Sequence, residues 1–222
     1  MKDNPWQDFA KSESMVHQLD RESVSQHNAK AKPEHQFLLQ LAPEPWIGNL
    51  EGKLLVLYAN PGATESDIRG ELRNEHDLIV DKSIKNLNQK LTNYPHFFFD
   101  PELDGTTGST WFLKKYRRLI EATSRERVAK NLVTCELAPY HSKNWYQPKI
   151  MPPTQEFTFN IVRKAIDRKA TIVVGRGKKI WEKHVPELIG YPLVCEPNSK
   201  QNASISPGNY PNDFNKILNS ID

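Results

Sequence analysis

Residues 53 to 59 read KLLVLYA, an apolar run without the alternation of a strand that has one face in water. Such a run is typical of a central strand that is covered on both faces. Asn60, Pro61 and Gly62 follow at once, and these turn formers predict that the strand ends there. A strand buried on both faces needs a layer of structure on either side, so the segment indicates an α/β domain.

Three later segments have the same apolar character and similar polar endings. They are KNLVTCELAPY at 130–140, TIVVG at 171–175 and YPLVC at 191–195. Apolar residues at helical spacing occupy 109–124 and 154–170 between them. Strands that alternate with helices predict a single three-layer α/β/α domain, in which helices cover both faces of a mostly parallel, four-stranded sheet.

Other segments give further predictions. Apolar residues at 36–41 predict a short helix, and HFFFD at 96–100 predicts a short strand. The charged segment 66–91 predicts a partly exposed helix. Residues 1–35 are polar, and we expect them to form an arm or a frayed helix, with the α/β domain at 36–222.

Composition and cysteine usage limit the class of protein. The chain of 222 residues has a formal net charge of +3, which permits contact with a polyanion without requiring it. Cys135 and Cys195 lie in apolar surroundings without zinc-ligand spacing, so we expect buried free thiols, as in a reducing cytoplasm. The N-terminus lacks the apolar core of a secretory signal, and no apolar run approaches about 18 residues. We therefore expect a cytoplasmic protein that does not span a membrane.

The polar loops after the four strands lie where ligands bind in a sheet of this kind. They read ANPGATESD, TCELAPYHSK, GRGKK and PNSKQNASISPGN, and they are rich in amides, hydroxyls, glycine and lysine. None has the residue order of a nucleotide-phosphate loop or of the Gly-x-Ser-x-Gly turn of acyl transfer. We expect neither a cofactor nor a metal. Such a cleft suits a placed water that attacks a bond breaking mainly by departure of its leaving group.

These loops together resemble the uracil-DNA glycosylase superfamily. Tyr-Ala-Asn-Pro-Gly at 58–62 resembles the first motif of its mismatch-specific and thymine-glycosylase branch, a strand followed by Gly-x-Asn-Pro-Gly. ATIVVGRGKKIW at 170–181 is similar to the family's late strand and Gly turn, and SISPGNYPNDFNKIL at 204–218 is similar to its last motif. The resemblance covers residues 43 to 222 in order. It implies a uracil-DNA glycosylase-like fold that hydrolyses the N-glycosidic bond of a nucleotide flipped out of DNA.

The resemblance implies roles for the first loop. Asn60 would hold the attacking water, and because an amide cannot take its proton, we expect a slower enzyme than the Asp-bearing relatives. Pro61 would stiffen the loop, Gly62 would let the backbone approach the ligand, and Ala59 would line the base pocket. The alternative is that Asn-Pro-Gly is only a turn.

Other family positions bear on the base that leaves. Phe98 falls where the family stacks an aromatic ring on the flipped base, although an aromatic triplet is also typical of a core. Thr134 replaces the pyrimidine-reading Asn, and a hydroxyl cannot offer that amide's paired donor and acceptor. With Glu136 just beyond it, we expect a roomier, more polar pocket. Ser204 aligns with the histidine that stabilises departing uracil, and a shifted register would use Asn202 instead.

A further set of residues would contact DNA. Ser206, Gly208 and Asn209 would bind phosphates, and Tyr210 would fill the vacated stack. The basic residues at 114–118 would add to the electrostatic footprint. The remaining candidates are His141, Lys143, Arg176 and Lys178. Each has the alternative interpretation of an ordinary solvated residue.

The sequence therefore predicts a monofunctional DNA glycosylase that acts as a monomer on a modified or damaged pyrimidine. A bulky base such as glucosylated hydroxymethylcytosine in phage DNA, excised as antiviral defence, suits the expected pocket. The alternatives are a repair glycosylase for uracil or mismatched thymine, a hydrolase of free nucleosides, and a non-catalytic DNA-binding protein on the same fold.

Overall fold

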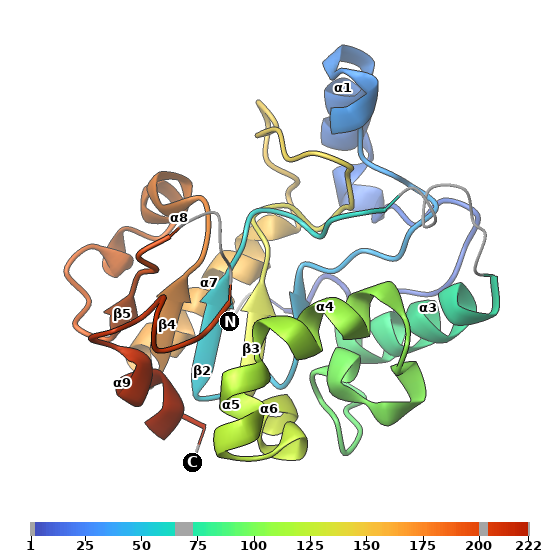
Figure 1. Cartoon of the computed structure of the whole chain (residues 1–222). Coiled ribbons are helices and arrows are strands. Elements are labelled where there is room, and N and C mark those ends of the chain that lie inside the picture. Colours follow the sequence, from blue (N-terminus) through green and yellow to red (C-terminus); the bar gives the residue numbers. More distant parts are fainter. Residues whose placement is uncertain (1–2, 65–72, 200–203, 222) are drawn as a thin grey trace.

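The computed structural model describes residues 3–64, 73–199 and 204–221 of the chain. Its centre is a five-stranded mixed sheet with helices on both faces (Figure 1). The strands are β1 (Trp46–Ile47), β2 (Leu54–Leu57), β3 (Leu132–Cys135), β4 (Thr171–Val174) and β5 (Val194–Cys195), in the spatial order β1-β3-β2-β4-β5. β1 is antiparallel to β3, and the other pairs are parallel. The expected α/β class is confirmed, but the sheet has five strands instead of four.

The residues of β2 are buried on both sides of the sheet, as the apolar run predicts. Leu55 and Leu57 belong to one hydrophobic cluster, whereas Leu54 and Val56 belong to another. None of these four side chains is more than 1% exposed. Because successive side chains of a strand point to opposite faces, a strand between two cores needs apolar residues at every position.

Helices α7 (Gln155–Asp167) and α8 (Lys178–His184) cover one face of the sheet. Phe157, Val162 and Trp181 pack in the same cluster as Leu55 and Leu57. α7 lies behind the sheet in Figure 1. The prediction of a helix at 154–170 is therefore confirmed, because apolar residues at helical spacing face this core.

The opposite face is covered by several short helices. α4, α5 and α6 lie in front of the sheet in Figure 1. They share one cluster with Leu54 and Val56. The elements are the 3₁₀ helix η3 (Phe97–Phe99), α4 (Thr107–Lys115), α5 (Arg117–Ala122), α6 (Arg125–Asn131) and α9 (Phe214–Asn219).

The edge strand β1 is held by α3 (Arg73–Leu87), which partly fulfils the prediction of a helix in 66–91. Asn86 donates from Nδ2 to the Trp46 carbonyl at 2.8 Å, and its Oδ1 accepts from the Gly48 amide at 2.9 Å. The sequence did not indicate β1, because two residues after a proline carry no strand periodicity.

The remaining short elements are mostly 3₁₀ helices. They are η1 (Gln18–Asp20), α1 (Arg21–Lys30), η2 (Pro33–His35), η4 (Pro101–Leu103) and η5 (Pro186–Leu188).

Two local predictions are wrong, and a third is confirmed only in part. Residues 36–41 form no helix, because the Phe37 amide donates instead to Asn28 Oδ1 at 2.8 Å. The segment 96–100 contains η3 and not a strand, since its amides bond within the segment, as Phe99 N does to His96 O at 3.0 Å. The helix expected at 109–124 is two helices that meet at Tyr116, whose φ of −105° lies outside the helical range.

The N-terminal segment contributes residues to the main core, and its helix α1 agrees with the helix that was one of the two expectations for residues 1–35. Trp6 and Asp20 are both 0% exposed. Asp20 accepts hydrogen bonds from Tyr140 Oη at 2.7 Å, from Thr154 N at 2.9 Å and from Thr154 Oγ1 at 2.6 Å. This polar segment can be buried because three hydrogen-bond donors satisfy the carboxylate of Asp20.

Both cysteines are buried free thiols, as expected. Burial raises the pKa of the Cys195 thiol to about 12 and also raises that of Cys135. Among the helices of the described residues, none has both the length and the apolar character needed to cross a membrane.

Candidate active site at the carboxyl ends of the strands

The order in which the chain adds parallel strands to the sheet reverses between β2 and β4. From β2 the chain crosses to β3 on one side, and it later returns to place β4 and β5 on the other side. Loops at the carboxyl ends of two such strands diverge and leave the usual ligand site of an open α/β sheet. Here the two loops are 58–62 and 175–177, and they include the Asn-Pro-Gly turn.

Asn60 is held at this edge by its amide nitrogen. Nδ2 donates to Ser142 Oγ and to the Pro61 carbonyl, both at 2.9 Å. Ser142 is 1% exposed and donates in turn to the Asn144 carbonyl at 3.0 Å. With both amide hydrogens engaged, the side chain offers Oδ1 as an acceptor. This arrangement can hold a water but cannot remove its proton.

The backbone around Asn60 is rigidly connected to the sheet. The Ala59 carbonyl accepts from Ala138 N at 3.1 Å, and the Tyr58 carbonyl accepts from Trp181 Nε1 at 2.9 Å. A Cβ on Gly175 would lie 3.0 Å from the Tyr58 ring, so this glycine permits the close approach of β4. Pro61 is buried, whereas Gly62 is exposed, with open space where a Cβ would stand.

Glu136 stands next to Tyr58 at the end of β3. Leu57 pairs with Cys135 in the parallel register, so the next residues on the two strands are Tyr58 and Glu136. Glu136 Oε2 is buried without a hydrogen-bond partner in the described structure. Burial raises the pKa of the Glu136 carboxyl well above its ordinary value, and nearby Glu44 raises it further while Arg176 opposes the shift. A neutral carboxyl at a strand end can both donate and accept a hydrogen bond.

Two tyrosines lie below this edge. Tyr58 and Tyr116 share a hydrogen bond of 2.9 Å between their hydroxyl oxygens. Burial raises the pKa of both phenols, so both stay neutral at physiological pH. Both rings belong to the same hydrophobic cluster as Leu54 and Val56, and as neutral phenols they add no charge beside the strand end.

His141 braces the loops instead of facing solvent. Its Nδ1 lies 2.8 Å from the Gly62 carbonyl, and its Nε2 lies 3.1 Å from the Ala42 carbonyl and 3.9 Å from Glu44 Oε2. Both ring nitrogens are therefore occupied by acceptors of the protein itself. The expected DNA contact of His141 does not fit this geometry, whereas the neighbouring Lys143 is exposed.

Thr134 and Phe98 lie in the core and not in an open pocket. Thr134 is 2% exposed, and its Oγ1 lies 3.2 Å from His96 Nε2. Phe98 is 5% exposed and stacks on Phe112 at 5.0 Å between centroids. A Cβ on Gly108 would clash with the Phe98 ring at 2.2 Å. Both residues were expected to bind the base, and in this structure the surrounding side chains fill that space instead.

His96 is a buried histidine that the sequence did not single out. It is 0% exposed, and burial lowers its pKa to about 3, so it is neutral at physiological pH. Its ring contacts Phe99 and Phe112 at 4.9 and 4.6 Å between centroids. The only sequence signal was its position before the aromatic triplet.

The last predicted motif is held by polar contacts of Asn209 and by the burial of Tyr210. Asn209 is 4% exposed, and its Oδ1 accepts from the Ser199 amide at 2.9 Å while its Nδ2 donates to the Ser204 carbonyl at 3.1 Å. Tyr210 is 2% exposed, in the cluster that contains Val56. Burial of Asn209 and Tyr210 does not fit their expected roles at a phosphate and in the DNA stack.

Other parts of that motif remain accessible. Gly208 is exposed and Ser206 is partly exposed. Asn202, the alternative to Ser204, lies outside the described residues.

The expected cations divide into paired and unpaired groups. Lys178 contacts both Glu196 and Glu182, and Arg118 donates to Glu121 at 2.9 Å. Arg176 is exposed and makes no ion pair with any described residue. Its field nevertheless reaches Glu136 and Tyr58.

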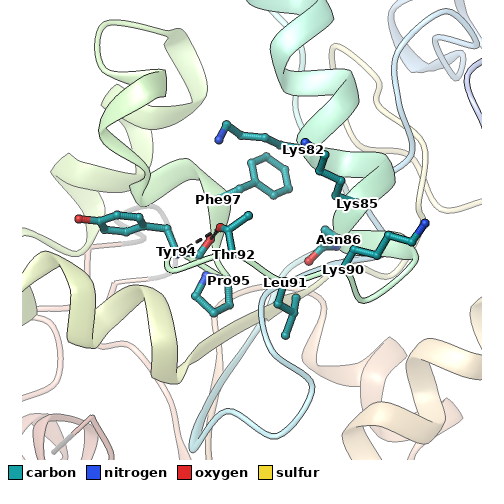
Figure 2. Close-up of a pocket in the computed structure, with 9 residues that line it drawn as sticks. All are labelled: Lys82, Lys85, Asn86, Lys90, Leu91, Thr92, Tyr94, Pro95 and Phe97. Atoms are coloured by element: carbon teal, nitrogen blue, oxygen red, sulfur yellow. Dashed lines mark hydrogen bonds between the residues drawn. The ribbon is translucent and has the colours of Figure 1, made fainter.

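Two surface depressions lie away from the strand ends. One is lined by α3 and the segment after it (Figure 2), and its cavity volume of about 10 Å³ has room for about one water. Its Lys82 already donates to Asp100 at 2.7 Å and to Glu102 at 2.8 Å. The other, of about 70 Å³, lies between Leu50 and α7. In the described part of the chain, no three His, Cys, Asp or Glu side chains gather as metal ligands.

Comparison with known proteins finds no match to a family model, a curated protein or a solved structure.

Proposed function

We propose that this protein is a monofunctional DNA glycosylase that removes a modified cytosine. The observation that carries the proposal is the placement of Asn60 and Glu136 after the carboxyl ends of two adjacent parallel strands. Asn60 presents an acceptor oxygen beside the strand end, and the Oε2 of Glu136 is buried without a hydrogen-bond partner among the described residues. The resemblance of 58–62 to the Asn-Pro-Gly motif supports the same reaction and a uracil-DNA glycosylase-like fold.

Asn60 would orient the water that attacks the sugar. When the N-glycosidic bond breaks, positive charge develops on the sugar and negative charge on the base. A weakly activated water is sufficient if bond breaking runs ahead of attack. The amide then positions the water through Oδ1, and the fixed Nδ2 contacts to Ser142 and Pro61 keep Oδ1 in place.

Glu136 would face the edge of the flipped base. A neutral carboxyl can accept from the exocyclic amine of cytosine through one oxygen and donate to N3 through the other. The O–H donor would also counter the negative charge that develops on the departing ring. This match supports cytosine and its bulky derivatives, such as glucosylated hydroxymethylcytosine in phage DNA, as the substrate class.

An oligonucleotide assay tests the proposal directly. Duplexes that carry glucosylated hydroxymethylcytosine, uracil or mismatched thymine are incubated with the protein, and abasic sites are cleaved with alkali. We expect release of the modified cytosine without strand cleavage before alkali. Absence of release from all three duplexes, while an abasic control is cut normally, contradicts the proposal for these bases.

Two variants assign the chemistry. Asn60→Ala should abolish release while leaving DNA binding intact, and Asn219→Ala, at an exposed position on α9, serves as the matched control. Glu136→Gln should lower release more than binding, because the amide cannot supply an acidic proton. Unchanged activity of Asn60→Ala would remove this residue from the mechanism.

A non-catalytic DNA-binding protein is the second candidate. Burial of Phe98 and Tyr210 favours it, because these rings fill the core instead of lining an open base pocket. DNA binding without release of any base at high protein concentration would support it.

A further inference from the structure

Trp111 is an exposed aromatic residue beside the candidate site. It lies on α4 and is 39% exposed, whereas its neighbour Phe112 is 8% exposed. Its ring meets Tyr58 edge-on at 5.8 Å and Phe112 at 4.8 Å between centroids. These contacts hold the indole in one orientation while a large part of it faces water. The same Tyr58 belongs to the strand end that carries Asn60.

One cation lies over this ring, and two further positive charges lie near that cation. Lys115 Nζ lies 5.6 Å from the centre of the Trp111 ring. Partial burial lowers the pKa of Lys115, and the nearby positive charges of Lys114 and Arg176 lower it further. Like charges held this close repel each other, and a bound anion would relieve the repulsion. We call Trp111, Lys114, Lys115 and Arg176 the Trp111 patch.

The cations of the Trp111 patch differ in their ion pairing from Arg117 and Arg118, the next basic residues along the chain. Among the described residues, none makes an ion pair with Lys114, Lys115 or Arg176. By contrast, Arg117 and Arg118 both contact Glu121, at 3.4 and 2.9 Å. The lysines of the depression in Figure 2 are a weaker candidate, because Lys82 there is bonded to two carboxylates and the cavity is small.

We propose that the Trp111 patch binds a single-stranded stretch of DNA next to the nucleotide in the site. A base stacks on the indole of Trp111, and Lys114, Lys115 and Arg176 contact the flanking phosphates. An indole beside unpaired cations fits the alternation of flat bases and phosphates in a single strand. An acidic peptide offers the charges without the flat rings. This inference rests on the proposed function for its position beside a flipped nucleotide, and binding can be measured without catalysis.

The experiment measures fluorescence anisotropy of fluorescein-labelled oligothymidylate with the full-length protein. Trp111→Ala should weaken binding about tenfold, as expected for the loss of one base–aromatic stack. Trp111→Phe, which retains a ring, should restore most of the affinity. Lys115→Ala should reduce the slope of log affinity against log salt by about 0.7, the value for one phosphate contact on a single strand. Arg118→Ala, whose charge is already paired, should change little.

Three outcomes would overturn the inference. The first is that Trp111→Ala binds the oligonucleotide as tightly as wild type and unfolds at the same temperature. The second is Trp111→Phe as weak as Trp111→Ala, which would show that stacking is not involved. The third is polyglutamate that competes as well as unlabelled oligothymidylate, which would show that the patch senses charge alone.

The result is separable from the glycosylase proposal. If binding depends on Trp111 but no base is released, the inference on the Trp111 patch stands and the glycosylase proposal fails. If a base is released but Trp111→Ala binds the oligonucleotide as tightly as wild type, the glycosylase proposal stands and the inference on the Trp111 patch fails.

Discussion

Asp20 and Glu136 both have buried carboxyl oxygens, but the donors differ: among the described residues, three bond to Asp20 and none bonds to Glu136 Oε2. Tyr140 and Thr154 together give Asp20 three hydrogen bonds, between 2.6 and 2.9 Å. Glu136 Oε2 has no partner among the described residues, and burial raises the pKa of its carboxyl. Asp20 joins the N-terminal segment to the core, whereas Glu136 lies at the carboxyl end of a parallel strand.

The difference indicates which buried acid serves the fold and which is available for chemistry. Burial of a polar group without a hydrogen bond is unfavourable, so a fold that retains one bears a cost. Asp20 offsets that cost locally through Tyr140 and Thr154. Glu136 has no such offset in the described residues, and strongly shifted acids of this kind concentrate at functional sites.

The largest expected effect is at Asp20. Asp20→Ala leaves the Tyr140 hydroxyl and both Thr154 donors buried without an acceptor, so we expect a loss of about 3 to 5 kcal/mol in the free energy of unfolding. Urea unfolding at pH 7 measures it. Asp20→Asn retains one acceptor oxygen and should lose less. A loss below about 1 kcal/mol for Asp20→Ala would show that these contacts do not anchor the segment.

An intermediate effect is expected at Glu136, and it depends on pH. The folded protein retains the Glu136 proton at pH values where the unfolded chain has lost it, so wild-type stability falls as pH rises above about 4.5 toward the raised pKa. Glu136→Gln cannot ionise and lacks this fall. As pH rises, the free energy of unfolding of Glu136→Gln should therefore increase relative to that of wild type, by up to about 1.4 kcal/mol per pH unit.

Urea unfolding of wild type and Glu136→Gln at several pH values between 4.5 and 8 gives this difference. A constant difference across the range would show that the carboxyl is already ionised in the folded protein.

The smallest effect is expected at an exposed carboxylate. Glu121 pairs with Arg117 and Arg118, but all three side chains are about half exposed. Glu121→Ala should change the free energy of unfolding by less than about 0.5 kcal/mol, because solvent screens such pairs. Thermal unfolding at low and high salt measures it. A larger loss would mean that charge pairing contributes to stability here as strongly as burial does.

Much of the sheet could be predicted because its strands carry their own signal. The run at 53–59 had to lie between two cores, and α7 shows its buried face through apolar spacing. The position of Asn60 at the end of β2 follows from the same pattern. β1 could not be predicted, because its two residues become a strand only through pairing with β3 and contact with Asn86.

The candidate site was less predictable, because burial decides what its side chains can do. Phe98 and Tyr210 lie in chain segments that also suit an exposed role, and their packing against other elements placed them in the core. His141 follows a proline turn that suggests exposure, yet its ring lies between two backbone carbonyls from distant segments. The division of cations into paired and unpaired ones likewise required the positions of their glutamates.

The sequence by itself determined the α/β class, the buried β2 and the Asn-Pro-Gly turn, because local periodicity and turn chemistry are written in neighbouring residues. Only the tertiary structure decided that Asp20 has three donors while Glu136 Oε2 has none among the described residues, and that Trp111 stands exposed beside Lys115. Such properties depend on which side chains meet from segments far apart in the chain. Local sequence does not specify these long-range contacts.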